Sequence, residues 1–425
     1  MPDRVNGPLI HPIGQHITLP TLSSYQLDNK LQVHSYQNNS AEVVQINVVF
    51  NAGLWHHPTK LVSFLTNRLM KEGTVNHTSK AIAEKMDFYG ASLYNQHDSD
   101  MASYGITCLK KHLPSVLPLL AEILQQPSYS EAELSLQCKL GKEGLKQEKE
   151  KTETIANDNF YRALYGENHP YGRVNEVSDY DKVNTAVIKA YHQSHYHPGN
   201  AYIFVAGAVD DQTAALLNTY LGTNAWAPKV NAEIPQYSIE AATTHQLYQE
   251  KKDAVQSSLR IGNRTIGLRH PDYNGLKIAT VLLGGYFGSR LMSNIREEKG
   301  YTYGIYATIS NRLQDNHFRI GTEVGKEVAK AALKEIYYEM EEMKQAAVDM
   351  EELVQVRNYL LGNYMDSLSN VFNTAQLLNN MITYKRTPED FYETINVLKN
   401  ITPDEIQQLA QRYFNTAELY EVVAG

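Results

Sequence analysis

Three closely spaced histidines are the residues in this sequence whose spacing most resembles that of a set of metal ligands. His192, His195 and His197 follow an H-x-x-H-x-H pattern, and imidazole nitrogen is a common zinc ligand. These residues lie where a predicted helix runs into a turn and then a strand, so their rings should point in different directions. We therefore expect ordinary packing and surface histidines rather than a metal centre.

Other chemically suggestive patterns have simpler structural explanations. The pair Gly284-Gly285 lacks the G-x-x-x-x-G-K-[ST] spacing of a phosphate-binding loop, so a turn or a close approach of two backbones is expected there. The sequence offers no nucleophile motif such as G-x-S-x-G. A stand-alone hydrolase with its own active site is therefore the least favoured of the hypotheses.

An internal repeat of about half the chain organises the elements that position these residues. Thr185 and Thr402 are each followed eleven residues later by a tyrosine, and then by an apolar run that ends in Val-Ala-Gly. The second copy opens with Thr402, Pro403 and Glu405, the pattern of an N-cap with a capping box. Each copy is predicted to end as a helix, a short turn and a core strand.

The middles of the two halves also correspond. Apolar side chains recur at helical spacing over 116–124 and over 333–340, and each stretch is followed by a second helix that opens near Ser130 or near Asp349. Residues 44–50 alternate like a half-buried strand, after a predicted hairpin at 25–31. The fold class is α+β, with two homologous tandem domains, each a mainly antiparallel sheet with helices on one face.

A segment of low periodicity separates the two halves. Residues 224–236 carry Trp226 and two prolines and show little regular patterning, which favours a linker. We place an N-terminal domain at residues 1–222, the linker at 223–240 and a C-terminal domain at 241–425.

Composition limits the classes of protein to which the chain can belong. The 425 residues are 42% hydrophobic and 20% charged, with a net charge of -8, which argues against extended contact with nucleic acid or anionic lipid. No apolar run is long enough to span a membrane. Met1–Gly7 contains no stretch that could serve as a signal peptide, so a cytoplasmic location is expected, or a periplasmic one only if the N-terminus is processed. Cys108 and Cys138 are too few for a disulfide framework.

Four segments share the order and spacing of their residues with one protein family. They are Ala52-Gly53, followed by the predicted helix Leu61–Met70 and Gly73-Thr74; Glu167–Arg173, with His-Pro-Tyr-Gly; His195–Asn200, with Tyr-x-Pro-x-Asn; and Gly284–Tyr303, with Gly-Gly, Ser-Arg-Leu, Arg-Glu and a final Tyr. Over nearly the whole chain, this pattern resembles the pitrilysin/insulinase-type zinc peptidases, and more closely their two-domain, mitochondrial-processing-peptidase-like branch. The resemblance implies the LuxS/mitochondrial-processing-peptidase-like metallohydrolase fold.

The same resemblance places the family's zinc motif on residues that do not bind zinc. Counting back from Gly73-Thr74, the H-x-x-E-H positions fall on Phe64, Asn67 and Arg68. Phenylalanine has no lone pair for a metal, and a permanent guanidinium cation repels one. Asparagine cannot take a proton from water as the family's glutamate does. We therefore call this motif degenerate and expect the chain to bind no zinc.

No neighbouring residue restores the metal site in the sequence. The family's third ligand would fall near Gln147-Glu148, and a single carboxylate does not hold a catalytic zinc. His56 and His57 are the nearby imidazoles, but adjacent side chains rarely point the same way and no third ligand accompanies them.

The second half keeps the part of the family pattern that handles substrate. Arg296 and Tyr303 stand at the family's spacing of seven residues, and in family members this pair reaches across a chamber to the substrate near the zinc of the opposite domain. A guanidinium fork and a phenol can both hydrogen-bond a substrate carbonyl and stabilise charge that develops on it.

These features predict a non-catalytic, substrate-binding subunit of a heterodimeric zinc metallopeptidase. Arg296 and Tyr303 would act in trans on peptides, at a site whose zinc lies on a zinc-bearing paralogous subunit. The alternative is a structural or assembly protein of the same fold with no proteolytic role. The chain alone is predicted to be inactive in either case.

Overall fold

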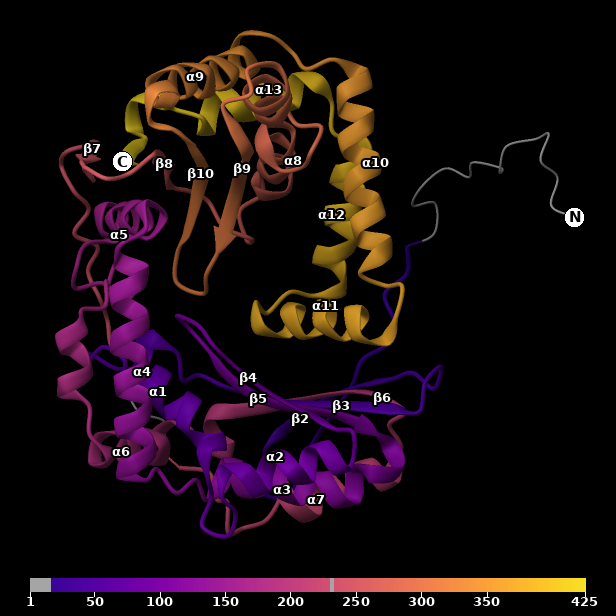
Figure 1. The fold of residues 1–425 in the computed structure, drawn as a ribbon. Coiled ribbons are helices and arrows are strands. Elements are labelled where there is room, and N and C mark those ends of the chain that lie inside the picture. Colours follow the sequence, from indigo (N-terminus) through magenta and orange to yellow (C-terminus); the bar gives the residue numbers. More distant parts are fainter. Residues whose placement is uncertain (1–16, 230–232) are drawn as a thin grey trace, which may run out of the picture.

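Two β-sheets, one from each half of the chain, form the framework of the protein (Figure 1). The computed structural model describes residues 17–229 and 233–425, so Met1–Gly7, on which the prediction about a signal peptide rests, lies outside the described residues. The first sheet has the order β1-β2-β6-β3-β5-β4 and the second β7-β11-β8-β10-β9. The strands are β1 (Ser23–Gln26), β2 (Gln32–Gln37), β3 (Val43–Phe50), β4 (Ser92–His97), β5 (Ala102–Leu109), β6 (Ala201–Gly207), β7 (Gln246–Gln249), β8 (Gln256–Arg264), β9 (Thr302–Asn311), β10 (Asn316–Gly325) and β11 (Tyr420–Ala424).

The two sheets have the same topology, which confirms the internal repeat. Strands β2-β6-β3-β5-β4 match β7-β11-β8-β10-β9 position by position. In each sheet the first of these pairs is parallel, and the other pairs are antiparallel. The predicted α+β class with mainly antiparallel sheets is therefore confirmed.

Helices follow the strands in the predicted order. In the first half they are α1 (Val62–Leu69), α2 (Ser79–Phe88), α3 (Leu113–Gln125), α4 (Glu131–Lys149), α5 (Thr152–Tyr165), α6 (Thr185–His195) and α7 (Asp211–Leu221). In the second half they are α8 (Tyr273–Gly284), α9 (Ala329–Gln345), α10 (Met350–Asp366), α11 (Val371–Thr383), α12 (Pro388–Asn400) and α13 (Pro403–Tyr413). Ser130, Asp349 and Thr402 are the N-caps of α4, α10 and α13, as predicted.

Two details of the sequence prediction need correction. The first half does not end at its core strand β6, because α7 follows that strand and packs against α3. The strand expected to run to Ala52-Gly53 ends at Phe50. Its continuation turns away because the Gly53 N–H donates to the Asp100 carbonyl, 3.2 Å away, rather than to a neighbouring strand.

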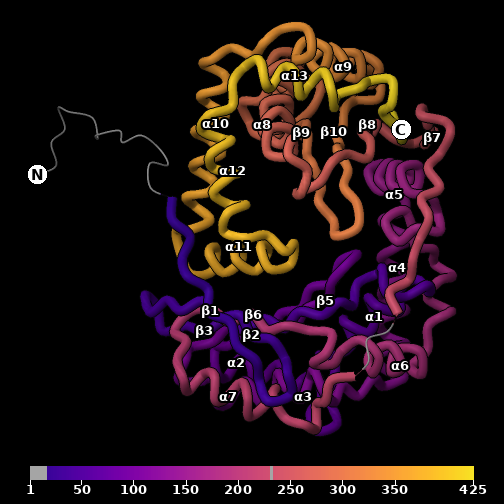
Figure 2. The backbone as a smooth tube through the Cα atoms, turned by 180° about the vertical axis from the view of Figure 1, so that it is seen from behind, coloured from indigo at the N-terminus to yellow at the C-terminus, as the bar shows by residue number. Residues whose placement is uncertain are grey.

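One face of each sheet packs on helices of its own half, and that packing forms two apolar cores. Val44, Ile46 and Val48 of β3 are fully buried in the first core, and Leu259 and Ile261 of β8 lie in the second. Figures 1 and 2 show α2, α3 and α7 along the first sheet and α8, α9 and α13 beside the second. Each fully buried aliphatic side chain contributes roughly 1.5–3 kcal/mol, so these cores fix where the strand ends lie.

The two halves also exchange helices. Helix α5, from the first half, lies against β8 and β11 of the second sheet, and α11, from the second half, lies against β6 of the first. Arg260 of β8 donates to the Asn157 side chain of α5 at 2.7 Å, and the Tyr202 hydroxyl of β6 lies 2.8 Å from that of Thr383 on α11. The run 201–207 is apolar throughout because both of its faces are covered.

The segment predicted as a linker contains no helix or strand among its described residues, and parts of it pack on the first half. Trp226 is buried in the first core, and its indole N–H donates to the Tyr196 carbonyl, 3.3 Å away. Tyr237 stacks edge-on against Trp55. No helix in the described ranges combines the length and the apolar character that a membrane span requires.

Candidate functional site

The degenerate zinc motif lies on α1, where its side chains are bound to their own neighbours. Asn67 is fully buried. Its amide oxygen accepts from the Asn95 side chain at 2.7 Å, and its backbone carbonyl accepts from the Tyr104 hydroxyl. The Phe64 ring is about one-third exposed and lies 5.9 Å, centroid to centroid, from the imidazole of His97. The position of the family's general base is therefore an internal packing position here.

The residue that α4 presents to this helix is Gln137, which the sequence prediction missed. The Arg68 Nε–H donates to the Gln137 side-chain oxygen at 2.6 Å. Glu148, the candidate third ligand, lies eleven residues further along α4, about 16 Å at 1.5 Å per residue. It pairs there with Lys151 at 2.6 Å. An exposed carboxylate so far along the helix does not face the motif positions.

These donors do not fit a zinc ion. A phenyl ring, an amide that is already hydrogen-bonded to its neighbours and a guanidinium offer none of the imidazole and carboxylate ligands that zinc requires. Within residues 17–229 and 233–425, no group of three or more His, Cys, Asp or Glu side chains could hold a metal. Cys108 is a buried free thiol whose pKa burial raises to about 11.

The histidines of the H-x-x-H-x-H pattern point to different partners. His192 contacts the Leu124 carbonyl at 2.9 Å, the His195 ring stacks on Tyr191, and His197 accepts from the Lys229 N–H. Burial lowers the pKa of both His192 and His195 to about 4. These side chains are packing histidines, as predicted, and they are neutral at pH 7.

His56 and His57 also diverge. The His56 ring lies 5.8 Å from that of His195, whereas the His57 ring lies edge-on to Tyr191 and its Nδ1 accepts from the Thr59 N–H at 3.0 Å. The two adjacent rings therefore contact different neighbours and do not point toward one common site.

The segment 284–303, which we call the Arg/Tyr segment, is held rigidly from both ends. A Cβ added at Gly284 would lie 2.7 Å from the Ala307 backbone nitrogen, which confirms the predicted close approach of two backbones. Arg290 forms a two-pronged ion pair with Glu352 of α10, with both N–O distances at 2.8 Å. Asn294 donates to Glu339 of α9 at 2.7 Å.

Arg296 lies on a π-helical turn, η6 (Met292–Glu298), a rare element that often marks functional sites. Its guanidinium lies 4.5 Å from the centroid of the Phe287 ring, and cation–π contact leaves the N–H donors of an arginine available. Phe287 is itself 59% exposed. The ring thus holds Arg296 in place without satisfying its hydrogen bonds, a support that the sequence prediction did not find.

A β-bulge directs Tyr303 away from the core. Strand β9 fits two residues, Tyr303 and Gly304, opposite the single residue Glu323 of β10. The Thr302 hydroxyl fixes this geometry, because it donates to the Glu323 carbonyl at 2.7 Å and accepts from the Gly304 N–H at 3.1 Å. Bulges of this kind re-aim side chains next to active sites. Tyr303 is 93% exposed as a result.

Both residues sit at one edge of the second sheet, because β9 is its terminal strand and η6 packs against β9. A guanidinium and a phenol at such an edge can donate hydrogen bonds to an oxygen that gains negative charge. Neither has an ion-pair or hydrogen-bond partner among the described residues. The arrangement can bind and polarise a carbonyl group, but it supplies no nucleophile and no base.

The His-Pro-Tyr-Gly motif joins the two halves rather than contributing to this site. The Tyr171 hydroxyl donates to the Asp100 carboxylate at 2.6 Å, and the other oxygen of Asp100 accepts from the Leu313 N–H at 3.1 Å. Leu313 lies between β9 and β10, so the tip of that hairpin is bound to the first half. Burial raises the pKa of Asp100.

Comparison with protein families matches both halves of the chain. Residues 32–174 match the model described as "Insulinase (Peptidase family M16)", and residues 182–360 match the one described as "Peptidase M16 inactive domain". The second match begins just before α6 and ends within α10. Together the two models cover roughly three quarters of the chain.

Individual proteins match over most or part of the chain. "Uncharacterized zinc protease YmxG" of Bacillus subtilis is 23% identical over 400 residues, which is 92% of this chain and 96% of that protein. "Cytochrome b-c1 complex subunit 1, mitochondrial" of Bos taurus is 23% identical over 276 residues, 63% of this chain and 56% of that protein. A crystal structure described as "peptidase M16 inactive domain from Pseudomonas fluorescens" superimposes with a TM-score of 0.86 at 23% identity, over 95% of this chain and 98% of its own.

Proposed function

Because this chain belongs to the insulinase (M16) family of peptidases, we propose that it is the non-catalytic, substrate-binding subunit of a two-chain zinc peptidase that acts on peptides. All three zinc-motif positions of this member are substituted, so the zinc and the general base would belong to a paralogous partner. The chain would contribute Arg296 and Tyr303. A cytoplasmic location is part of the same proposal.

The observation that carries the proposal is an Arg/Tyr pair on a firm support, an exposed phenol and a half-buried guanidinium whose side-chain donors have no partner among the described residues. Tyr303 is 93% exposed on a bulge, and Arg296 rests on an exposed aromatic ring. A pair with unsatisfied donors at the surface is of little use to the stability of the fold, since polar contacts that solvent reaches contribute about 1 kcal/mol or less. Such donors are instead suited to a substrate oxygen that gains charge in the transition state.

The state of α1 supports the same division of labour. Asn67 is used inside the core and Arg68 is bound to Gln137, so this chain retains no water-activating group at the family's position. A carbonyl-binding pair without a nucleophile requires a second chain to complete the reaction.

The experiment is a mixing assay on an unstructured fluorogenic peptide in the presence of zinc. Three samples are assayed: the chain alone, the zinc-motif paralogue encoded in the same genome alone, and the two together. We expect no activity for the chain alone and a rate for the mixture at least about tenfold above that of the paralogue. A mixture no faster than the paralogue would contradict the proposal. Chelator-sensitive activity of the chain alone would mean that the chain holds a metal site of its own, which would contradict it as well.

A second candidate function is that of a structural subunit. The sequence match to subunit 1 of the cytochrome b-c1 complex favours it, since that protein is named as a component of a larger assembly. A structural subunit predicts a stable complex with a partner and no increase in peptidase rate. Size-exclusion chromatography of the same mixture, read beside its rate, separates the two functions.

A further inference from the structure

A cavity of about 730 Å³ lies between the two halves, apart from the Arg/Tyr segment and from the motif positions on α1. Its walls come from the ends of β3 and β6 in the first half, and from the loop before α8, the β9–β10 hairpin tip and the end of α11 in the second. This volume falls within the range of roughly 300–1,000 Å³ typical of ligand sites.

Three cationic side chains converge on this cavity from separate loops. Arg269 lies before α8, Arg312 at the hairpin tip and Lys385 just after α11. In the part of the chain that the structure describes, none of the three has a carboxylate oxygen within the 4.0 Å of an ion pair. Arg269 and Lys385 are exposed, whereas Arg312 is half-buried.

Arg312 is fixed in place without having its hydrogen bonds satisfied. Its guanidinium lies 4.4 Å from the centroid of Tyr171 and 5.2 Å from that of Tyr161. Stacking on aromatic rings restrains the guanidinium but leaves its five N–H donors free. None of these donors has a protein acceptor in the described ranges.

One carboxylate in the cavity wall offsets part of this positive charge, since Asp100 interacts electrostatically with Arg312. Asp100 is the only carboxylate among the described residues that line the cavity. Its oxygens accept from the Tyr171 hydroxyl and the Leu313 N–H, and the latter contact ties it to the hairpin tip. The cavity therefore carries an excess of positive charge that its own wall does not neutralise.

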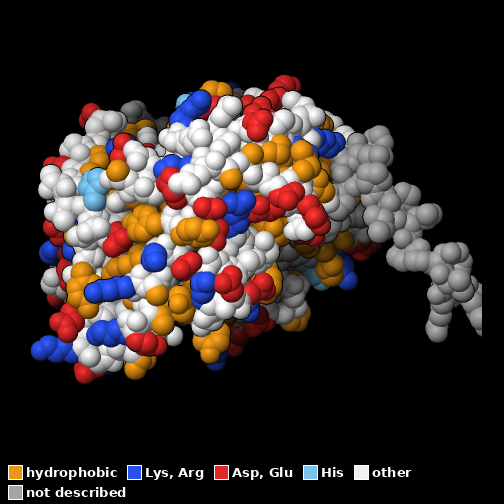
Figure 3. Space-filling model, turned by 90° about the horizontal axis from the view of Figure 1, so that it is seen from above, with side chains coloured by type: hydrophobic (Ala, Val, Ile, Leu, Met, Phe, Trp, Pro, Cys, Tyr) orange, Lys and Arg blue, Asp and Glu red, His pale blue; other side chains and the backbone are white. Residues whose placement is uncertain are grey.

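This excess contrasts with the rest of the molecule. The chain has 47 acidic and 39 basic residues, and Figure 3 shows red and blue side chains interspersed on the face seen from above. Positive charge collected inside a concave wall in a net-negative protein focuses the local field on an anion. The geometry points to a ligand with negative charge and, at this volume, of more than a single small ion.

We propose that this cavity binds the carboxylate groups of an acidic peptide segment, with Arg269, Arg312 and Lys385 as its recognition residues. The inference rests on the proposed peptide-binding function and names the class of peptide. Guanidinium groups recognise carboxylates through paired N–H···O bonds, and a lysine adds a point charge. Because the cavity walls come from both halves of the chain, a bound segment would contact both halves at once.

The test is a binding measurement on the full chain without any partner, using fluorescence anisotropy of a labelled Gly/Ser peptide that contains aspartates and ends in a free carboxylate. Two further peptides separate the sources of the carboxylate, and a third, both amidated and free of aspartate, is the neutral control. One has an amidated C-terminus, and the other has every aspartate replaced by asparagine. Loss of binding on amidation assigns the site to a C-terminus, and loss on replacement assigns it to acidic side chains.

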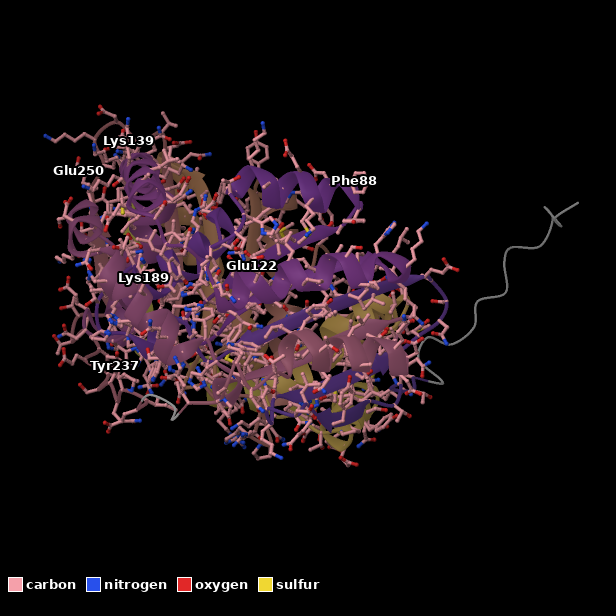
Figure 4. The ribbon with its side chains drawn as sticks, turned by 90° about the horizontal axis from the view of Figure 1, so that it is seen from below. Phe88, Glu122, Lys139, Lys189, Tyr237 and Glu250 are labelled. Carbon is pink, nitrogen blue, oxygen red and sulfur yellow. The ribbon has the colours of Figure 1, made fainter. Side chains whose placement is uncertain are left out.

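The variant Arg269→Gln/Lys385→Gln removes two recognition charges from exposed side chains, so folding should be unaffected; thermal unfolding verifies this. A matched control, Lys139→Gln/Lys189→Gln, removes the same net charge from α4 and α6, on the side of the first half seen in Figure 4. We expect the cavity variant to bind the acidic peptide at least about tenfold more weakly and the control to bind it like the unmodified chain.

Equal affinity of the unmodified chain and the cavity variant overturns the proposal, as does equal affinity for the acidic peptide and for a peptide that is both amidated and free of aspartate. A loss of the same size in the control would show general electrostatics rather than a site. Because no partner is present, failure here leaves the mixing result untouched, and a failed mixing assay leaves this binding result untouched.

Discussion

The α1 region and the Arg/Tyr segment differ in whether their polar side chains have hydrogen-bond partners within the protein. On α1, Asn67 is fully buried, and its side-chain amide accepts from the Asn95 side chain and donates to the Ser103 carbonyl. In the Arg/Tyr segment, a bulge leaves Tyr303 exposed and a π-helical turn carries the half-buried Arg296. The side-chain donors of both have no partner among the described residues.

The difference shows how to separate a retained function from a retained fold. A region that has lost its function is free to turn polar groups inward, where they stabilise the structure. A region that keeps irregular backbone and leaves two polar side chains without partners gains nothing in stability from that irregularity. We therefore assign the proposed binding role to the second half of the chain.

The largest effect should follow from restoring a carboxylate to the α1 region with Asn67→Glu. The partners of Asn67 among the described residues are the neutral groups of Asn95, Ser103 and Tyr104, and the added methylene overfills the site. The free energy of unfolding should therefore fall by about 3 kcal/mol or more. Chemical denaturation measures this. Phe64→His, at a partly exposed position on the same helix, is the control and should change stability by about 1 kcal/mol or less. A tolerated glutamate would mean that α1 is not closed.

A pH effect of intermediate size should distinguish the two regions. Burial lowers the pKa of His192, on α6 against α1, to about 4, whereas the Arg/Tyr segment contains no histidine. Between pH 6.5 and 4 this histidine binds a proton in the unfolded state but not in the folded state. Its contribution to the free energy of unfolding is therefore fully present above pH 6.5 and is lost as the pH falls toward 4. Each such histidine contributes a slope of about 1 kcal/mol per pH unit near pH 5.

His192→Gln should make that slope shallower by about this amount, which denaturation at a series of pH values measures. Lys189→Gln, exposed on the same helix, should leave the slope unchanged. An unaltered slope in His192→Gln would mean that this histidine is not buried in its neutral form.

The smallest effect should come from the support of the Arg/Tyr segment. Glu352→Gln weakens the two-pronged ion pair with Arg290, whose members are about one-fifth exposed, and should lower the free energy of unfolding by about 1 kcal/mol. Glu341→Gln, in the single-pronged pair with Lys344 in which the carboxylate is 43% exposed, should cost about half of that or less. Equal effects would indicate that the Arg290 pair is an ordinary surface contact.

The sequence predicted the repeat, the sheets and the helix caps because these depend on local periodicity and on N-cap residues such as Ser130 and Thr402. The spacing of Arg296 and Tyr303 also singled them out as substrate-binding residues, and that role stays a prediction. The exchange of α5 and α11 between the halves was not predictable, because it depends on pairings between residues far apart in the chain. Arg260 and Asn157 join α5 to β8, but nothing in the sequence around either residue indicates that they are in contact.

The details of the site escaped prediction for the same reason. Gln137 faces Arg68 because of the way α4 crosses α1, and spacing alone had suggested Glu148. The cations of the cavity come from three loops, and only the fold brings Arg269, Arg312 and Lys385 to one wall. The bulge at Tyr303 depends on the register with β10, which a single strand's sequence does not specify.

The most direct test of the central claim is the peptidase rate of the mixture with the zinc-motif paralogue, comparing the unmodified chain with Arg296→Ala/Tyr303→Phe. Both side chains are peripheral to the cores, so the variant should fold and still bind its partner, which chromatography verifies. If the pair binds the reacting carbonyl, kcat/KM of the mixture should fall by about a hundredfold or more. An unchanged rate in an intact complex would contradict the account.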